Sequence, residues 1–600
     1  MLDNRNLFLA VALSLAILLV SQFYFDMTRP PPPPEAAKKT EQTAKAPGAT
    51  PGTAPSAAPA VGNVPNPTAG AAGHAATPSV PGSAAAQATG ASTRSAMLTT
   101  GSPRIKIVTP SISGSIALKG AIVDDITLTK YRETTDPKSA AIVLLQPKGL
   151  SDAYYAQFGW VPQGTVAVPG PDTLWTADRD TLTPEQPLTL TWSNGQGLTF
   201  KRIYAVDSDY MFTITQEVVN TTQAPVSMHA YGLISRHTTP QTTGFYILHE
   251  GLLGVFDKTL KEIDYDDLHK SPEIKQSSRG GWIGITDKYW LAALVPDQTV
   301  PVNSRFYYSK PNNVDAYQVD YVGPSLTAPP GQPIKTVNHM FVGAKRIKLL
   351  DGYEEKLGVA RFDLAIDFGW FYFLTKPIFY ALLWLEHHFI NLGIAILILT
   401  VGIKLVFFPL ANKSYVSMSK MKMLQPKMVQ LKERYGDDRQ RLNQEMMELY
   451  KKEKVNPASG CLPILIQIPV FFALYKVLFV TIEMRHAPFY GWIHDLSAPD
   501  PTTLFNLFGL IDWTPPHFLM IGVWPLIMGA TMFLQQKLNP QPADPVQAKI
   551  FMFLPLFFTF LLASFPAGLV IYWAWNNLLS IIQQWVIMRR QGLTGKQALQ

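Results

Sequence analysis

The feature that most constrains this chain is a set of apolar stretches, each close in length to a membrane-spanning helix. One lies near the N-terminus, and five more follow residue 390 of the 600 residues. A helix needs about 20 predominantly apolar residues to cross the hydrocarbon core of a bilayer. Charged residues make up only 16% of the chain, against about 25% in typical soluble proteins. The sequence therefore predicts a multi-pass membrane protein and excludes a wholly soluble enzyme.

Six spans are expected. The first, residues 7–25, ends in aromatic residues, and no small-residue cleavage site follows it. An uncleaved anchor within residues 1–28 is therefore favoured over a cleaved signal peptide. The second transmembrane helix is expected at 391–411. Spans three to six are expected within residues 460–588, at 462–484, 519–535, 550–565 and 569–586.

The composition changes between the anchor and the second span. Residues 29–103 begin with five consecutive prolines and contain no Phe, Trp or Tyr. They cannot bury enough apolar surface to fold, so a disordered linker is expected. Residues 104–350 alternate apolar and polar side chains with a period of two, and turn signals such as Asn194-Gly195 separate the runs, which predicts a large β-sandwich. The aromatic-rich segment 351–390 is expected to include a helix lying in the membrane interface.

Loop charges give the expected orientation of the spans. Residues 412–459 carry eleven Lys or Arg against six Asp or Glu, whereas residues 485–517 carry one Arg against three Asp. Basic loops stay in the cytoplasm. We therefore expect segment 412–459, both termini and the short tail 589–600 to be cytoplasmic, with the β domain on the opposite side of the membrane.

Lys404 is the most unusual residue of the expected spans. A lysine at a transmembrane helix centre costs about 2.5–3.5 kcal/mol, and no carboxylate lies in the middle of any expected span. Side chains lean toward the N-terminus of their helix, so Lys404 is expected to lean into the membrane, although snorkelling to the interface stays open. Lys476 is interpreted as structural. A hydrated, positively charged recess is predicted around Lys404, with polar groups from Gln467, Tyr572, Trp573, Asn576 and Asn577.

Catalytic and metal-binding chemistry find little support. Cys461 is the only cysteine, which excludes a disulfide framework and a multi-cysteine metal site. Residues 104–350 contain no HExxH, GxSxG, Walker A or GxGxxG pattern. A net charge of +7 over 600 residues is too diffuse to indicate nucleic-acid binding. We therefore expect no enzyme activity, no cofactor, no metal site and no DNA partner.

Segment 412–459 predicts a cytoplasmic amphipathic hairpin. Apolar residues recur at helical spacing on both sides of Gly436, which is expected to separate two helices. Six of the eighteen methionines lie between Met418 and Met447, and methionine suits surfaces that meet varied apolar partners. The alternative, in which these methionines face one another or the bundle, stays open.

The second half of the chain also contains a distinctive set of motifs. It includes Leu424-Gln425-Pro426-Lys427, Glu433-Arg434-Tyr435-Gly436-Asp437-Asp438, Gly460-Cys461-Leu462-Pro463, Trp492-Ile493-His494-Asp495 and Phe565-Pro566-Ala567-Gly568-Leu569. Across residues 367–589 this set closely resembles the YidC/Oxa/Alb family of membrane protein insertases. The layout of anchor, external domain and helical core resembles the Gram-negative form of that family. Gly280-Gly281-Trp282 extends the resemblance into the β domain.

The resemblance implies a five-helix insertase core in the bacterial inner membrane and a periplasmic β-supersandwich. It implies a groove in the core that is open to the cytoplasm and lipid and closed on the outside. Family members carry a basic residue, usually arginine, at the position of Lys404. The substrate path is expected at Thr400, Lys404, Gln467, Phe471, Met528, Leu561, Tyr572 and Trp573. Hairpin contacts to partners are expected at Lys420, Lys422, Lys427, Arg434 and Arg439.

The function that the resemblance implies is insertion, folding and assembly of inner-membrane proteins, alone or with the Sec translocon and its accessory proteins. Nascent membrane proteins and lipids are expected partners, as are the ribosome and the signal-recognition-particle receptor. The alternative is a transporter or channel with an external ligand-binding domain. Intramembrane carboxylates or inverted repeats would favour that alternative, and the sequence shows neither. An envelope carbohydrate enzyme anchored by the helices is a third possibility.

Overall fold

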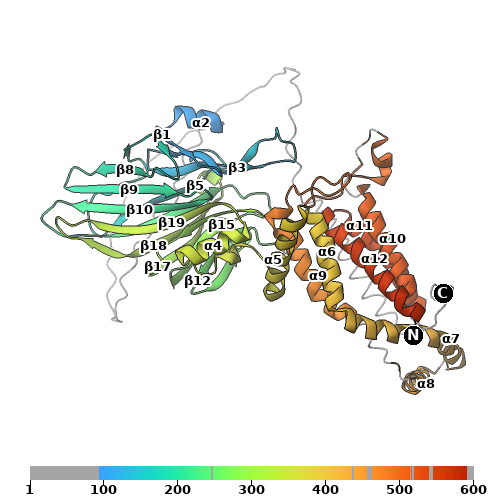
Figure 1. Ribbon diagram of the computed structural model, residues 1–600. Helices are drawn as coiled ribbons and strands as arrows, with labels where there is room; N and C mark the ends of the chain where they lie inside the picture. The colour runs from blue at the N-terminus through green and yellow to red at the C-terminus, as the bar shows by residue number, and fades with distance from the viewer. Residues whose placement is uncertain are drawn as a thin grey trace, which may run out of the picture. The chain divides into compact units, whose positions relative to one another are not determined.

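The computed structural model describes residues 93–244, 248–435, 438–453, 455, 462–511, 513, 515–516, 519–539 and 545–590. The expected anchor at 1–28, the expected linker up to residue 92 and the tail 591–600 lie outside the described residues. Figure 1 shows two kinds of structure in the remainder, a strand-rich part followed in sequence by a helical part.

Two antiparallel sheets form the β domain, so the predicted β-sandwich is confirmed. The ten-stranded sheet has the order β14-β17-β18-β11-β5-β3-β2-β1-β7, with β4 paired to β3. Its strands are β1 (Arg104–Val108), β2 (Ile112–Ala117), β3 (Ile122–Arg132), β4 (Ala141–Leu145), β5 (Tyr154–Pro162), β7 (Thr181–Leu182), β11 (Val226–His237), β14 (Glu273–Arg279), β17 (Pro301–Ser309) and β18 (Ala316–Ala328). Only the β1–β7 pair within it is parallel.

The second sheet has nine strands in the order β13-β12-β15-β16-β19-β10-β9-β8-β6. They are β6 (Thr176–Ala177), β8 (Leu188–Ser193), β9 (Leu198–Val206), β10 (Met211–Asn220), β12 (Gly251–Phe256), β13 (Thr259–Ile263), β15 (Trp282–Thr286), β16 (Trp290–Val295) and β19 (Ile334–Ala344). Strand β9 alternates buried and half-buried residues along its whole length. The period-two pattern of the sequence therefore places Phe200 and Tyr204 in the core, where both are fully buried.

One part of the expected linker is structured. Residues Arg94–Thr100 form helix α2, which Thr93 caps by accepting a hydrogen bond from the Ala96 amide. The Arg94 guanidinium pairs with the Asp125 carboxylate on β3. The prediction that residues 94–100 belong to a disordered linker is wrong, because a side-chain cap and an ion pair to the β domain hold this short helix in place.

Polar contacts connect the segment that follows the β domain to the first long helix. After β19 come α4 (Ile347–Leu357), η2 (Phe362–Ala365) and α5 (Tyr372–Phe389). The Lys376 ammonium on α5 lies 2.7 Å from Asp363 and 3.2 Å from Asp351. Helix α5 buries Phe379 and Leu382 on one face, while Phe373 and Trp384 on another are exposed. The expected interfacial segment therefore contains an amphipathic helix, which continues past Pro377.

The helical part contains α6 (Leu392–Val406), α7 (Phe408–Tyr435), α8 (Arg439–Lys452), α9 (Leu462–Val480), α10 (Val523–Leu538), α11 (Pro545–Leu562) and α12 (Ala567–Arg590). Helix α6 begins where the Asn391 side chain accepts a hydrogen bond from the Ile394 amide. The expected span 391–411 is not one straight helix, because α6 and α7 meet at Phe407 with a bend of 70°. Pro409 lies in the first turn of α7, where its missing N–H leaves no helical hydrogen bond unmade.

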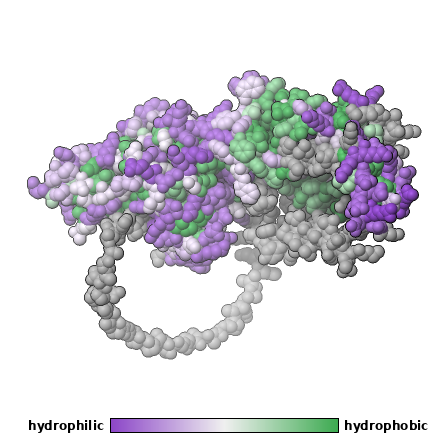
Figure 2. Space-filling view, turned by 90° about the horizontal axis from the view of Figure 1, so that it is seen from below, coloured by the Kyte–Doolittle hydropathy of each residue, from purple (hydrophilic) through white to green (hydrophobic). Residues whose placement is uncertain are grey.

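No single described helix is long and apolar enough to cross a membrane, and only the bent α6–α7 pair satisfies those criteria together. The surface polarity nevertheless divides along the chain. Figure 2 shows hydrophobic residues gathered over part of the helical region, whereas the β domain and the α7–α8 hairpin are mostly hydrophilic on the face shown. Exposed apolar side chains on α10 and α11 include Ile527, Phe533, Phe553 and Phe560.

The buried Lys345 gives a pH-dependent test of the fold. Its ammonium donates a 2.8 Å hydrogen bond to the Thr286 hydroxyl, and burial lowers its pKa to about 8, which nearby carboxylates such as Asp287 offset in part. The unfolded chain, with a lysine pKa near 10.5, binds more protons than the folded chain between these values. Stability conferred by this site therefore rises with pH from about 8 to about 10.

We expect Lys345→Met to melt above the unmodified protein at pH 7, with a difference that shrinks as the pH approaches 10. Thermal unfolding followed by intrinsic fluorescence measures both curves. Lys335→Met, at an exposed position on β19, the strand that ends one residue before Lys345, is the matched control and should show no such trend. A pH-independent difference for Lys345→Met would contradict this account of the buried lysine.

Candidate functional site

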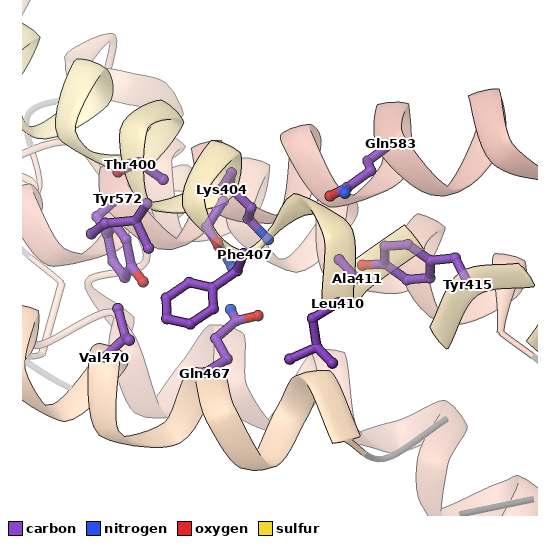
Figure 3. Close-up of a pocket in the computed structure, with 12 residues that line it drawn as sticks. Thr400, Lys404, Phe407, Leu410, Ala411, Tyr415, Gln467, Val470, Tyr572 and Gln583 are labelled. Atoms are coloured by element: carbon purple, nitrogen blue, oxygen red, sulfur yellow. The ribbon is translucent and has the colours of Figure 1, made fainter. Parts of the chain in front are cut away.

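A small cavity lies between α6, α7, α9 and α12. Its volume is about 50 Å³, which is room for a few water molecules. The lining residues are Thr400, Ile403, Lys404, Phe407, Leu410, Ala411, Tyr415, Gln467, Val470, Tyr572, Asn576 and Gln583. Figure 3 shows Gln467 of α9 reaching toward the side of the cavity that carries Lys404 and Phe407. The site thus combines an apolar wall with several polar groups and one cation.

Lys404 lies one turn before the bend and is half-buried. Its Nζ donates a 2.7 Å hydrogen bond to the Ser580 hydroxyl, which in turn donates a 2.8 Å hydrogen bond to the Asn576 carbonyl on α12. Among the described residues, no carboxylate lies within ion-pair distance of this ammonium. The lysine is therefore held by a neutral hydroxyl, so its positive charge stays uncompensated within this part of the structure.

Four predicted path residues line the cavity, namely Thr400, Lys404, Gln467 and Tyr572. The Thr400 hydroxyl donates to the Ile396 carbonyl one turn earlier, so its hydrogen is engaged within its own helix. Tyr572 is buried, whereas Gln467 is half-buried. These residues come from three different helices, and the fold brings them together around one cavity.

Two further predicted residues form an aromatic cluster beside the cavity. The rings of Phe471 and Trp573 lie 4.8 Å apart, and Phe471 also stacks on Tyr475 and Tyr572 at 6.1 and 6.5 Å. Phe558 of α11 lies 5.8 Å from Trp573. This cluster joins α9, α11 and α12 along an apolar surface next to the polar recess.

Met528 and Leu561 lie apart from the cavity. Met528 on α10 is fully buried against Leu562, Val570 and Ala574. Leu561 on α11 is half-buried and is not among the cavity-lining residues. Packing between α10, α11 and α12 thus occupies the Met528 side chain.

Sequence reasoning missed Tyr415, Ser580 and Gln583. A signal for two of them was present, because Tyr572, Asn576, Ser580 and Gln583 recur at spacings of four, four and three residues, which places them on one face of a helix. Tyr415 had no such signal. It reaches the cavity because of the bend between α6 and α7.

Side-chain hydrogen bonds also connect α10 to α12. The Gln584 side-chain amide donates to the Leu538 carbonyl and to Asn539 Oδ1, both at 3.1 Å. Asn577 donates to the Thr531 hydroxyl at 3.4 Å. These bonds position the helix that carries Ser580. Lys476, interpreted as structural, pairs at 2.6 Å with Asp367 in the segment before α5.

The predicted hairpin residues have different surroundings. Lys420 and Arg434 on α7 are exposed. Lys427 pairs with Glu453 at 2.7 Å, and Lys422 is buried with its ammonium 3.3 Å from the Lys537 carbonyl. The Lys422 ammonium therefore contacts the end of α10. Arg439 is the first residue of α8, and its side chain lies outside the described residues.

Comparison with known proteins identifies the family. The YidC periplasmic domain family matches residues 104–381, and the 60Kd inner membrane protein family matches residues 384–594. The chain is 51% identical over 605 residues to the membrane protein insertase YidC of Methylorubrum extorquens, covering 98% of this chain and 96% of the relative. The chain belongs to the YidC family. The Bradyrhizobium diazoefficiens YidC is 50% identical, with 99% of this chain and 97% of that relative covered.

Among solved structures, an active YidC insertase with its first transmembrane domain resolved matches with a TM-score of 0.34 and 17% identity, covering 80% of this chain and 92% of that one. Family membership itself follows from the sequence relatives. They are membrane protein insertases rather than enzymes, which confirms the expected insertase class. The transporter and carbohydrate-enzyme alternatives are set aside on the same ground. YidC relatives are inner-membrane proteins with a periplasmic domain.

Two adjacent glutamines give a matched test of the helix packing in this YidC family member. Gln584→Leu removes both donors to the end of α10 and leaves a carbonyl without its partner, so we expect a loss of about 1–3 kcal/mol in unfolding free energy. The Gln583 amide nitrogen is buried without a hydrogen-bond partner among the described residues. Gln583→Leu should therefore leave the thermal unfolding midpoint unchanged or raise it. Equal destabilisation by both variants, measured in detergent by thermal unfolding, would contradict the stabilising role of the Gln584 hydrogen bonds between α10 and α12.

Proposed function

We propose that the cavity around Lys404 is the deepest part of a hydrophilic groove that receives polar segments of nascent membrane proteins. The observation that carries this proposal is the Lys404 ammonium, held by the Ser580 hydroxyl at 2.7 Å in a recess lined by polar groups from three other helices. A cation in such surroundings attracts an acidic segment. The same recess hydrates a polar segment that would otherwise meet hydrocarbon.

The mechanism is physical rather than catalytic. Moving a charged side chain into hydrocarbon carries a large desolvation cost, and the cost grows with the apolar distance to be crossed. A wet groove shortens that distance from the cytoplasmic side. Because Coulomb interactions strengthen as the effective dielectric constant falls, Lys404 attracts an acidic tail more strongly inside the groove than it would in bulk water.

The apolar part of a substrate needs a different surface. The cluster of Phe471, Trp573 and Phe558 provides aromatic contacts between α9 and α11. We propose that the hydrophobic segment of the substrate slides past this cluster into lipid, driven by removal of its own apolar surface from water. Leu561 on α11 belongs to this path, whereas the fully buried Met528 reaches it only if α10 and α11 separate.

The proposed topology follows the charge pattern of the loops. Six spans, with both termini and the α7–α8 hairpin in the cytoplasm, place the basic segment 412–459 inside and the β domain in the periplasm. The bend of 70° between α6 and α7 supports this arrangement, because it lets the chain leave the membrane close to Lys404. The groove then opens toward the side from which nascent chains arrive.

The hairpin is the proposed contact site for the translation and targeting machinery. A groove of about 590 Å³ between α7 and α8 is lined by Lys427, Gln430, Leu431, Arg434, Glu445, Glu448, Leu449, Lys451 and Lys452. Basic side chains with intervening acids suit ribosomal RNA or an acidic receptor surface. Cooperation with the Sec translocon and its accessory proteins is proposed from the family alone.

Replacing the groove cation tests the central step. Lys404→Leu should slow insertion of a substrate with an acidic periplasmic tail about tenfold, equivalent to about 1.4 kcal/mol in the barrier. Lys404→Arg keeps the charge and should remain close to the unmodified rate. Insertion is measured by protease protection of the tail in proteoliposomes.

A second substrate serves as the control for that experiment. Changing its tail carboxylates to amides should remove most of the difference between Lys404→Leu and the unmodified protein. If the acidic and amidated tails suffer equally, Lys404 acts on folding of the insertase rather than on substrate charge. Unchanged insertion of the acidic tail by Lys404→Leu would contradict the proposed role of the groove cation.

Charge reversal on the hairpin tests the proposed partners. Lys420→Glu combined with Arg434→Glu should reduce ribosome co-sedimentation at least threefold at low salt, with a smaller effect as salt screens the interaction. Lys422→Met, at a buried position facing α10, is the matched control and should bind ribosomes normally. Normal binding by the double variant would remove the hairpin surface from the proposal.

A further inference from the structure

The loop between α9 and α10 presents an apolar tip that neither the groove nor the hairpin explains. Its 3-10 helix η5 (Leu504–Gly509) carries Leu504, Phe505, Leu507 and Phe508, each between 39% and 50% exposed. Leu510, which follows, is 85% exposed. No residue from Leu504 to Leu510 is charged. Monomeric soluble surfaces rarely gather apolar side chains in this way without a partner.

The backbone of this tip is strained. Leu507 and Phe508 adopt left-handed conformations, with φ of 50° and 58°. Glycine adopts such conformations readily, but they are unfavourable for residues with bulky side chains. Hydrogen bonds from the Phe508 amide to the Thr503 carbonyl and from the Ile511 amide to the Asn506 carbonyl close the turn. The structure therefore holds two large apolar side chains outward in conformations that they do not favour by themselves.

The base of the same loop is built to be rigid. Asp500 is buried and accepts hydrogen bonds from the Trp492 indole, the Thr502 amide and hydroxyl, and the Trp524 amide at the start of α10. A Cβ on Gly522 would lie 2.4 Å from the Asp500 carboxyl carbon, so only glycine permits this close approach. The hydrogen bonds that Asp500 accepts thus fix the base of the apolar tip relative to α10.

The loop also contacts the ends of other helices. The Ala567 and Gly568 amides at the start of α12 donate to the Ala498 and Leu496 carbonyls. Asn391, which caps α6, lies 3.4 Å from the Pro488 carbonyl. Beside it, Ile390 at the end of α5 is a third bulky apolar residue with positive φ, 56°, and it is 92% exposed. Exposed apolar residues with strained backbones therefore gather at one end of the helical region.

We propose that the tip Leu504–Leu510 is an anchor that inserts into the lipid interface of the bilayer. Three features favour lipid as the occupant. The protein belongs to an inner-membrane family, the loop that carries the tip contacts the starts of α10 and α12, which expose apolar side chains such as Ile527 and Ile582, and no residue from Leu504 to Leu510 is charged. Aromatic residues such as Phe505 and Phe508 are typical of membrane interfaces. The anchor fixes the depth of the ends of α6, α10 and α12 in the membrane.

A fluorescent probe at the tip tests this anchor. The only cysteine, Cys461, is first changed to Ser, and an environment-sensitive dye is attached to the full-length variant Phe508→Cys in vesicles of zwitterionic phosphatidylcholine. We expect a blue-shifted emission, at least threefold protection from aqueous iodide, and quenching by spin-labelled lipids that is strongest for labels near the headgroup. Leu510→Cys should behave in the same way, and because the Leu510 side chain is 85% exposed, this substitution should leave the fold intact.

The control probe is Gln196→Cys, at an exposed turn of the β domain, which should remain accessible to iodide and insensitive to lipid quenchers. Iodide quenching at Phe508→Cys and Leu510→Cys equal to that of the control would overturn the proposal. A blue shift seen only after addition of purified translocon would also overturn it, in favour of a protein partner. The outcome is independent of the groove, because insertion of an acidic tail is measured separately with Lys404 unchanged.

Discussion

A single ammonium group among apolar helices is the constraint from which the rest of the site follows. A lysine in such a place must be hydrated or hydrogen-bonded, because an unpaired charge in hydrocarbon is strongly unfavourable. In this protein the Ser580 hydroxyl accepts a hydrogen bond from the Lys404 ammonium. Hydrogen bonds from Gln584 to the end of α10 position the helix that carries Ser580. A neutral partner keeps the side chain in place without cancelling its charge. That arrangement suits a site that must attract an acidic segment and then release it.

Two other features of the fold position the helices around that site. Short ion pairs connect the segment that follows the β domain to the helices, including those of Lys376 with Asp363 and Lys476 with Asp367. The bend at Phe407 turns α7 away from α6 directly after Lys404, so the hairpin begins close to the cavity. In the proposed mechanism, this places the contact surface for the translation machinery next to the groove entrance.

Much of this architecture was predictable because it follows from simple periodicities. Alternation with a period of two predicted the β-sandwich, and the polar residues expected around Lys404 included Gln467, Tyr572 and Asn576, which line the cavity with it. The helix α2 was missed because its stability depends on the Arg94 contact with Asp125, more than thirty residues later. The bend at Phe407 was missed because the apolar stretch around Pro409 fits two structures equally well. A proline can lie inside one continuous span, or it can lie in the first turn of a new helix, as it does in α7. Tyr415 and the burial of Lys422 depend on that bend, so neither was visible from residue patterns alone.

Water access at position 404 tests the central claim most directly. Lys404→Cys in a Cys461→Ser background can be labelled with a membrane-impermeant maleimide in inverted vesicles, where the cytoplasmic face is outward. The account predicts rapid labelling at position 404, whereas Ile396→Cys, buried on the same helix, should react only after denaturation. Position 404 shielded to the same degree as position 396 would contradict a hydrated groove and the mechanism built on it.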